Sequence, residues 1–235
     1  MSVQSTVFKS VVAADRVDYP ALEHTIQQWW DDNNVRQSYL KRNEHSHKQY
    51  SFLDGPITAN NPMGVHHGWG RTYKDLYQRF KTMQGYKQRY QNGFDCQGLW
   101  VEVNVEQELG FKNKRDIEEY GIAEFVERCK ERVFTYARRQ TEQSIRLGYW
   151  MDWGNDYYTL SDENNYTIWS FLKKCQERDL IYKGRDVMTW CPRCATGISN
   201  MEIETEGYKE VTHLSLYVRF PLEDRPNEYL LAWTT

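Results

Sequence analysis

The sequence predicts an α/β fold, and the prediction rests on three consecutive segments. The aromatic-rich run QYSFLD, residues 49–54, has the composition of a strand and ends at Gly55 and Pro56. A loop with two prolines and two asparagines then leads into a strongly patterned helix, and KQRYQNGFD, residues 87–95, returns as a second strand. Strand, loop, helix and strand in this order form a βαβ unit, which commonly binds ligands beyond the C-terminal ends of its strands.

Size and charge limit what kind of protein this is. A chain of 235 residues can form one large domain or two smaller ones. Its net charge of -3 argues against coating of nucleic acid by bulk positive charge, although it neither requires nor excludes an RNA partner. Because the first residues lack a leader pattern and no run of about 18 apolar residues occurs, we predict a soluble, cytoplasmic protein without a membrane partner.

Two helices are predicted in the first third of the chain. Asp18 can cap a helix entered through Pro20, in which apolar residues recur at helical spacing as far as about Val35. The helix after the loop has one apolar stripe and ends near Gly85. This stripe consists of Trp69, Tyr73, Leu76, Phe80 and Met83. We expect it to face the core rather than to form a ligand platform.

The rest of the chain predicts helices followed by strands. Two helices, from Ile122 to about Gly148 and from the Ser161 cap to about Arg178, are expected to form a helical insert. Period-two patterns then predict strands in HLSLYVRF, residues 213–220, and EYLLAWTT, residues 228–235. Since an apolar strand closes the sequence, we expect the chain to be the front part of a longer polypeptide.

The loop at residues 55–64 and the two histidines after it, His66 and His67, suggest a phosphate site. Backbone amides at a helix start carry partial positive charge, and glycines let a phosphate approach them closely. Imidazoles at the same place can donate hydrogen bonds to a phosphate oxygen. The alternative is a Gly/Pro turn followed by partly buried or capping histidines. Neither of the ordinary glycine-rich nucleotide motifs is present to decide between them.

The cysteines predict at most half of a metal site. Five cysteines form an odd set that does not resemble a disulfide framework, and only Cys191 and Cys194 are close together. Their spacing in WCPRCATG suits two thiolates of a tetrahedral zinc site. The alternative is a pair of free thiols in a turn.

Several motifs in collinear order resemble one enzyme family. They are GPITANN, the two histidines, RTYKDLYQRFKTMQGY, NGFDCQGLWVEVNVEQELGFKNKRDIEEYGI, WCPRC and the final AWTT. From about Asp18 onward the chain is similar to the N-terminal part of a class Ia aminoacyl-tRNA synthetase, closest to isoleucyl-tRNA synthetase. The resemblance implies the first half of a Rossmann-type nucleotide-binding catalytic domain, a helical insert, and the β-rich beginning of a connective and editing region.

The family's H-x-G-H motif implies the ATP site. Its histidines contact the phosphates of ATP, and an alignment without gaps places Gly64, Val65, His66 and His67 on it. His67 matches the second histidine, whereas glycine stands in place of the first and His66 in place of the motif glycine. The resemblance thus implies catalytic roles for His67 and His66. It assigns ATP binding to Gly55, Pro56, Gly64, His66 and His67.

A second motif, GWDxHGLPVE, is similar to GFDCQGLWVE and implies the amino acid site. Its aspartate, which contacts the substrate amino group, matches Asp95, and a carboxylate opposite an ammonium forms a charge-assisted hydrogen bond. Gln97 replaces the motif histidine and Trp100 the motif proline. The family's GPP segment is matched by Gly55 and Pro56, with isoleucine in place of its second proline. The amino acid site implied is Asp95, Pro56 and Ile57.

The resemblance also implies a domain plan and partners. The expected parts are an N-terminal extension and helix in residues 1–49, the half catalytic domain in residues 50–180, and the start of the zinc-knuckle region in residues 181–235. ATP with Mg²⁺, an aliphatic amino acid and tRNA are the expected ligands of a full-length monomer. Zinc is expected to need a second cysteine pair beyond this chain, so Cys191 and Cys194 alone should bind it weakly or not at all.

Three hypotheses for function stay open. The first is an N-terminal fragment, inactive alone, of an isoleucine-specific synthetase, with leucine or valine as alternative substrates; the editing domain, second nucleotide-binding half, KMSKS lysine signature and anticodon-binding helices would lie beyond it. The second is a non-catalytic module that binds ATP or an amino acid. The third is one subunit of a split synthetase.

Overall fold

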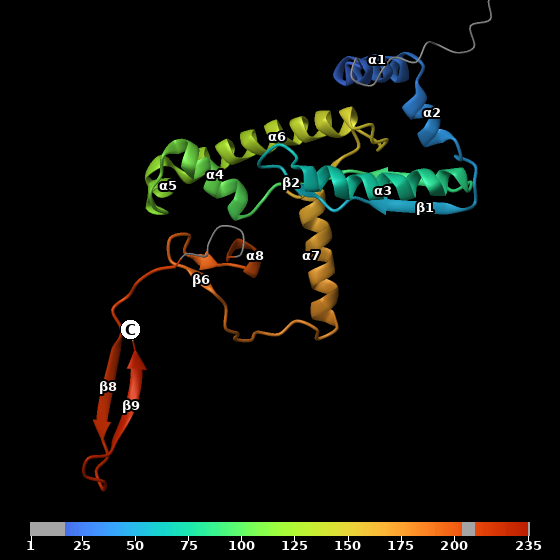
Figure 1. Cartoon of the computed structure of the whole chain (residues 1–235). Helices are drawn as coiled ribbons and strands as arrows, with labels where there is room; N and C mark the ends of the chain where they lie inside the picture. The colour runs from blue at the N-terminus through green and yellow to red at the C-terminus, as the bar shows by residue number, and fades with distance from the viewer. Residues whose placement is uncertain (1–16, 204–209, 235) are drawn as a thin grey trace, which may run out of the picture. The chain divides into compact units, whose positions relative to one another are not determined.

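The computed structural model describes residues 17–203 and 210–234, which divide into two compact units. The first unit ends at Lys183 and the second begins at Gly184 (Figure 1). The N-terminal extension predicted before Asp18 lies almost entirely outside the described residues. In the part of the chain that is described, no helix combines the length and apolar character that a membrane span requires.

The predicted βαβ unit is confirmed. Strand β1 (Gln49–Leu53) pairs in parallel with β3 (Lys87–Gln91), and helix α3 (Val65–Met83) connects them. The register runs from Gln49 opposite Lys87 to Leu53 opposite Gln91. The next backbone amide, that of Asp54, continues the ladder by donating to the Gln91 carbonyl at 2.9 Å.

Beyond this pair the chain forms a second parallel sheet in the order β2–β4–β5. Its strands are β2 (Ile57–Thr58), β4 (Gly93–Asp95) and β5 (Tyr157–Tyr158). The strand predicted at residues 87–95 is therefore two strands, because at buried Asn92 the pairing passes to the segment around β5. Tyr157 donates its backbone N–H to the Asn92 carbonyl at 3.1 Å. A Cβ at Gly93 would lie 2.0 Å from the Tyr157 ring, so only glycine fits there.

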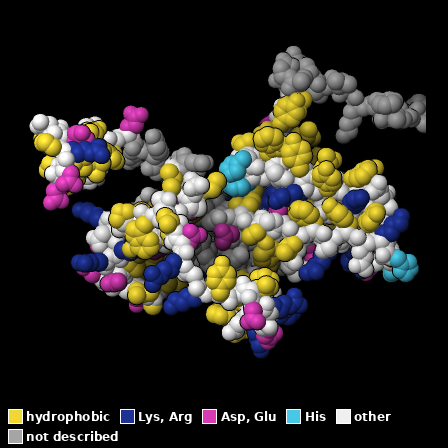
Figure 2. All heavy atoms as spheres, turned by 90° about the horizontal axis from the view of Figure 1, so that it is seen from below, with side chains coloured by type: hydrophobic (Ala, Val, Ile, Leu, Met, Phe, Trp, Pro, Cys, Tyr) yellow, Lys and Arg dark blue, Asp and Glu magenta, His cyan; other side chains and the backbone are white. Residues whose placement is uncertain are grey.

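Helix α3 buries a polar face, and the predicted apolar core stripe is wrong. Its buried residues are Arg71, Asp75, Gln78 and Thr82, whereas all five stripe residues are more than half exposed. The buried side chains are held by specific partners: Arg71 bonds Asn92, and Thr82 bonds the Tyr39 hydroxyl at 3.0 Å. Hydrophobic side chains consequently gather on the surface, as on the face in Figure 2.

The hydrophobic core lies between the second sheet and the long helix of the predicted insert. Helix α6 (Ile122–Arg146) packs on it, and helices α4 (Leu99–Leu109) and α5 (Arg115–Tyr120), absent from the prediction, lie beside α6 (Figure 1). One buried cluster consists of Ala59, Phe94, Cys96, Val101, Val133 and Ala137. A second, formed by Val105, Ile117 and Phe125, joins α4, α5 and α6.

The N-terminal helix is shorter than predicted. Helix α1 (Tyr19–Asp32) has the expected Asp18 cap, with Ala21 N–H donating to its carboxylate at 3.1 Å. The predicted end near Val35 is wrong, because Asn34 adopts a left-handed conformation with φ of 51°. A separate helix, α2 (Val35–Lys41), begins after it.

Helix α7 (Asp162–Glu177) and the last two strands agree with the predicted order, and a short hairpin and helix that were not predicted lie between them. Helix α7 starts at the expected cap, where the Asn164 amide donates to the Ser161 hydroxyl at 3.3 Å. In the second unit, β6 (Trp190–Cys191) and β7 (Thr196–Gly197) form a short hairpin, followed by α8 (Asn200–Glu202). Strands β8 (Leu216–Pro221) and β9 (Tyr229–Thr234) pair antiparallel, which confirms both predicted C-terminal strands.

Candidate active site

The predicted site residues of the first unit lie in or after parallel strands. Thr58, the last residue of β2, is the register partner of Asp95, the last residue of β4. The loop after β2 leads directly into the first turn of α3, which carries His66 and His67. This end of a parallel sheet is where α/β folds bind ligands.

Asp95 lies half-buried with a carboxylate that is oriented but not neutralised. Thr58 Oγ1 donates to Asp95 Oδ2 at 3.0 Å, and Thr159 Oγ1 lies 3.5 Å from Oδ1. The backbone N–H of Gln97 is also 3.5 Å from Oδ1. Among the ion pairs of the described residues, none includes Asp95. The arrangement therefore presents a fixed negative charge that can receive a cationic group.

Thr159 is a site residue that the sequence did not indicate. Its hydroxyl accepts from the Cys96 backbone N–H at 2.9 Å, and its carbonyl lies 3.3 Å from the Gln97 side-chain nitrogen. It thus joins the chain after β5 to the chain after β4. It stands in no motif, so only the strand register could have placed it near Asp95.

His67 caps its own helix. Its Nδ1 accepts from the backbone N–H of Gly64 at 3.0 Å, as the third residue of a capping box does. Because Nδ1 is the acceptor, the neutral ring carries its proton on Nε2, which makes no hydrogen bond among the described residues. Burial lowers the pKa of His67, and the charges of His66 and Arg71 lower it further. The alternative of a capping histidine, left open by the sequence, thus accounts for Nδ1 of this ring. It leaves Nε2 for a ligand.

We expect His67 to titrate below the ordinary histidine pKa of about 6.5. The neutral ring is the form that the fold prefers, so its stabilising effect is lost as the pH falls from the ordinary value to the lowered pKa. Protonation of Nδ1 also removes the acceptor for the Gly64 amide. Titration of the His67 Cε1 proton by NMR measures this directly, and a midpoint at or above the ordinary value would contradict it.

His66 is exposed and occupies the space above Gly64. Its ring centroid lies 3.8 Å from that of His67. A Cβ at Gly64 would be 2.9 Å from His66 Cε1 and 3.0 Å from its Nδ1. An imidazole from residue 66 therefore fills the region into which a side chain at residue 64 would point.

Two glutamines of α6 hold the loop between β2 and α3. Gln140 donates through Nε2 to the carbonyls of Thr58 and Asn61, at 3.0 and 2.8 Å. Gln143 accepts from the Met63 backbone N–H at 2.8 Å. Sequence reasoning missed both, because glutamines on a long helix usually face solvent. They fix the loop that carries the helix start.

Gly55, Pro56 and Ile57 lie where β1 gives way to β2. Gly55 and Pro56 are exposed, and Ile57 is half-buried. A Cβ at Gly55 would meet open space, so packing does not demand glycine at that position. These residues follow buried Asp54 and lead to Thr58, which bonds Asp95.

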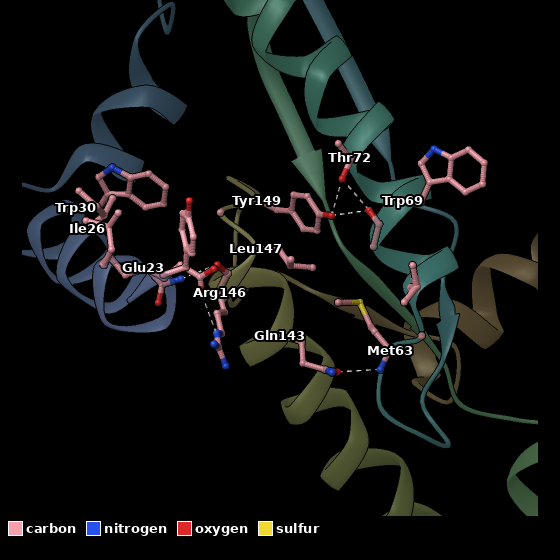
Figure 3. Close-up of a pocket in the computed structure, with 17 residues that line it drawn as sticks. Glu23, Ile26, Trp30, Met63, Trp69, Thr72, Gln143, Arg146, Leu147 and Tyr149 are labelled. Carbon is pink, nitrogen blue, oxygen red and sulfur yellow. Dashed lines mark hydrogen bonds and ion pairs between the residues drawn. The ribbon is translucent and has the colours of Figure 1, made fainter. Parts of the chain in front are cut away.

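A groove of about 940 Å³ opens beside the first turns of α3 (Figure 3). Its walls come from α1, from residues 63–72 and from residues 143–149. Tyr149 points from the last of these segments toward α3, where its hydroxyl donates to the Gly68 carbonyl at 2.5 Å and lies 2.9 Å from the Thr72 hydroxyl. The groove is mostly apolar, and the Arg146–Glu23 ion pair at 3.2 Å crosses it.

In the second unit, Cys191 ends β6 and Cys194 lies in the turn between β6 and β7. The backbone N–H of Cys194 is the main cause that holds the pKa of the Cys191 thiol below its usual value, whereas burial raises the pKa of Cys194. Within residues 17–203 and 210–234, no group of three or more potential ligand side chains gathers around a common point. The pair supplies two of the four ligands that a structural zinc ion takes.

The chain is similar to known proteins of one family. Residues 25–222 match the family described as tRNA synthetases class I (I, L, M and V). "Isoleucine--tRNA ligase 2" of Bacillus cereus is 42% identical over 213 residues, which are 91% of this chain and 20% of the relative. "Isoleucine--tRNA ligase" of Streptomyces coelicolor is 41% identical over 223 residues, 94% of this chain and 21% of the relative. The chain thus spans about a fifth of the length of these relatives.

A solved structure shows the same fold at low sequence identity. It is a LeuRS in a ternary complex with tRNA and LeuAMS from Agrobacterium radiobacter, with a TM-score of 0.53 and 18% identity. The likeness covers 75% of this chain and 20% of that one. The parallel sheets, the α/β order and the matched residues lead to one conclusion. This chain belongs to the class I tRNA synthetases, and the predicted first half of a Rossmann-type catalytic domain is confirmed.

Proposed function

We propose that the whole protein catalyses ATP-dependent aminoacylation of tRNA as an isoleucine–tRNA ligase. The observation that carries the proposal is that Asp95 ends β4 opposite Thr58, the last residue of β2, and that the loop after β2 leads into the His67 turn of α3. The 41–42% identity with isoleucine–tRNA ligases supports the choice of isoleucine. This chain alone, which spans about a fifth of those relatives, is expected to be inactive.

The first step joins the amino acid to AMP. The amino acid carboxylate attacks the α-phosphorus of ATP, the bond to the β-phosphate bridging oxygen breaks, and pyrophosphate leaves. His67 donates its Nε2–H to a phosphate oxygen as charge builds, and Asp95 holds the substrate ammonium. In the second step a terminal ribose hydroxyl of tRNA attacks the carbonyl and AMP leaves. No covalent protein nucleophile is needed, so positioning and electrostatics carry the catalysis.

The two ligands divide the site between them. Gly55, Pro56, Gly64, His66 and His67 take ATP, whose Mg²⁺ neutralises phosphate charge. Asp95, Pro56 and Ile57 take the amino acid, with Ile57 as an apolar wall for an aliphatic side chain. The backbone amides of Val65 and His66 precede the first amide of α3 that bonds a helix carbonyl, His67 to Gly64 at 3.1 Å, and such amides suit a phosphate.

A double substitution that restores the histidine and glycine positions of the family's H-x-G-H motif should retain more activity than either single substitution. In the full-length protein, Gly64→His with His66→Gly returns one imidazole to the space that the other left. Gly64→His alone places a Cβ 2.9 Å from the His66 ring, and His66→Gly alone removes an imidazole. The double variant is expected to lose less than either single one, with a coupling of about 0.5–3 kcal/mol in kcat/KM for ATP. Additive losses would contradict compensation.

Further ligands follow from the same proposal. Cys191 and Cys194 provide two zinc ligands, and the others come from outside this chain. tRNA is a further ligand of the full-length protein. The proposal also includes that the full-length protein is a monomer and acts in the cytoplasm.

The test is amino acid-dependent exchange of labelled pyrophosphate into ATP, by this chain and by the full-length protein. Exchange by the full-length protein with isoleucine supports the proposal. Faster exchange with leucine or valine would change the proposed amino acid but not the proposed reaction. Exchange restored only by a separately supplied chain would indicate a split synthetase. Binding of ATP or amino acid without exchange by any of these proteins would indicate a non-catalytic module.

A further inference from the structure

The buried face of α3 centres on one arginine. Arg71 is 1% exposed and lies one turn after His67 on the same helix. Its guanidinium donates to Ser144 Oγ at 2.5 Å and to Asn92 Oδ1 at 2.6 Å, and its Nε lies 3.2 Å from Asp54 Oδ2. Lys74 forms a second ion pair with Asp54. A planar fork with fixed donors suits such a three-way contact, which a lysine cannot reproduce.

Each partner of Arg71 belongs to a different part of the candidate site. Asp54 is fully buried and directly precedes Gly55. The Tyr157 hydroxyl donates a hydrogen bond to the backbone carbonyl of Asp54 at 2.9 Å. Asn92 stands three residues before Asp95, at the break between β3 and β4. Ser144 lies on α6 beside the sulfur of Met63, at 3.5 Å, in the loop before the histidines. One side chain therefore connects the Gly55 loop, the strand of Asp95, and the start of α3.

Stability alone does not account for this arrangement. A buried ion pair costs desolvation that its attraction often fails to offset, and an apolar replacement of similar volume is often neutral or stabilising. A guanidinium that is satisfied from three elements fixes their relative positions instead. A misplacement of about 1 Å in a reacting group can lower a rate about 100-fold.

We propose that Arg71 is a positioning residue for amino acid activation, holding the His67 turn and the Asp95 strand at the separation that the reaction needs. The inference rests on the proposed function. The expected effect is on kcat, because Arg71 is buried and its guanidinium is occupied by protein partners.

The same helix offers a matched control. Arg79 lies two turns later and also pairs with an aspartate, with Nε 2.6 Å from Asp75 Oδ2. It donates to the Gly148 carbonyl at 2.7 Å and stacks on Trp150 at 4.0 Å. Its partners are Asp75, on α3 itself, and Gly148 and Trp150, which follow the end of α6, and it shares none of them with Arg71. Arg79→Lys thus disturbs a more exposed arginine–aspartate pair on the same helix without touching the Asp54–Asn92–Ser144 junction.

The experiment compares Arg71→Lys and Arg79→Lys in the full-length protein by pyrophosphate exchange, together with thermal unfolding. We expect Arg71→Lys to lower kcat about 100-fold with little change in KM for ATP or isoleucine, and Arg79→Lys to leave kcat within a few-fold. Equal losses of kcat in the two variants would overturn this inference and leave the proposed function standing. Absence of exchange by the unsubstituted protein would overturn the proposed function and this inference with it.

Should Arg71→Lys fail to fold, Ser144→Ala decides. This variant removes one acceptor of the guanidinium and leaves the Arg71–Asp54 pair intact. A drop of several-fold in kcat at unchanged KM supports positioning through the junction. An unchanged kcat overturns it.

Discussion

Replacing His67 by glutamine in the full-length protein is expected to lower kcat for pyrophosphate exchange by a factor on the order of 100 or more while the unfolding temperature stays nearly constant. Glutamine at the third helix position can still accept from the Gly64 amide, so the capping bond of 3.0 Å has a replacement. The outward imidazole N–H, however, is lost from its fixed position. The measurement is steady-state exchange beside thermal unfolding.

The control for this prediction is His67→Ala, which removes both functions of the ring. It should lose the same activity and also about 1 kcal/mol of stability, the usual effect of removing a helix cap. A glutamine variant with nearly full activity would show that His67 only caps the helix. The phosphate role would then pass to other groups.

Asp95→Asn is expected to raise the KM for the amino acid by about 10-fold to 100-fold and to leave the KM for ATP unchanged. The substitution keeps the shape of the side chain and removes its charge. A hydrogen bond to a charged group contributes about 1.5–3 kcal/mol, which sets this range. Exchange rates at varied isoleucine and fixed ATP measure it.

Thr58→Val is the matched control for Asp95. It removes the donor 3.0 Å from Asp95 Oδ2 but leaves the carboxylate in place, so its effect on the same KM should be several times smaller. An equal KM for isoleucine in Asp95→Asn and the parent protein would remove Asp95 from the amino acid site.

The sequence predicted the order of elements well because that order depends on local signals. The Ser161 cap, the Gly/Pro loop and the alternation near the C-terminus each act within a few residues. Helix α4 was missed because LWVEVNVEQEL, residues 99–109, alternates valine with polar residues and so mixes strand and helix periods. The face of α3 was predicted wrongly because periodicity detects an apolar stripe but cannot tell that Arg71 and Asp75 have buried partners.

The site was predictable only where a motif marked it. Asp95 and His67 stood in recognised motifs; Asp95 ends β4, and His67 lies in the first turn of α3, after the loop that follows β2. Thr58 and Thr159 reach Asp95 through strand register, across 37 and 64 residues of sequence, which no local pattern encodes. The roles of the individual site residues remain predictions for the experiments above.

The attachment of α1 has a consequence for local opening. None of its residues is buried. It is held by Gln27, which donates to the carbonyls of Ile145 and Arg146 at 3.2 and 2.8 Å, by the Glu23–Arg146 ion pair and by the contact of Trp30 with Trp150. Amide protons of α1 should therefore exchange with solvent through a local unfolding event of low free energy, well before those of α3. That event also uncovers the last turn of α6, which contains Gln143, the side chain that holds Met63. Warming should thus loosen the chain before the histidines earlier than it melts the sheet.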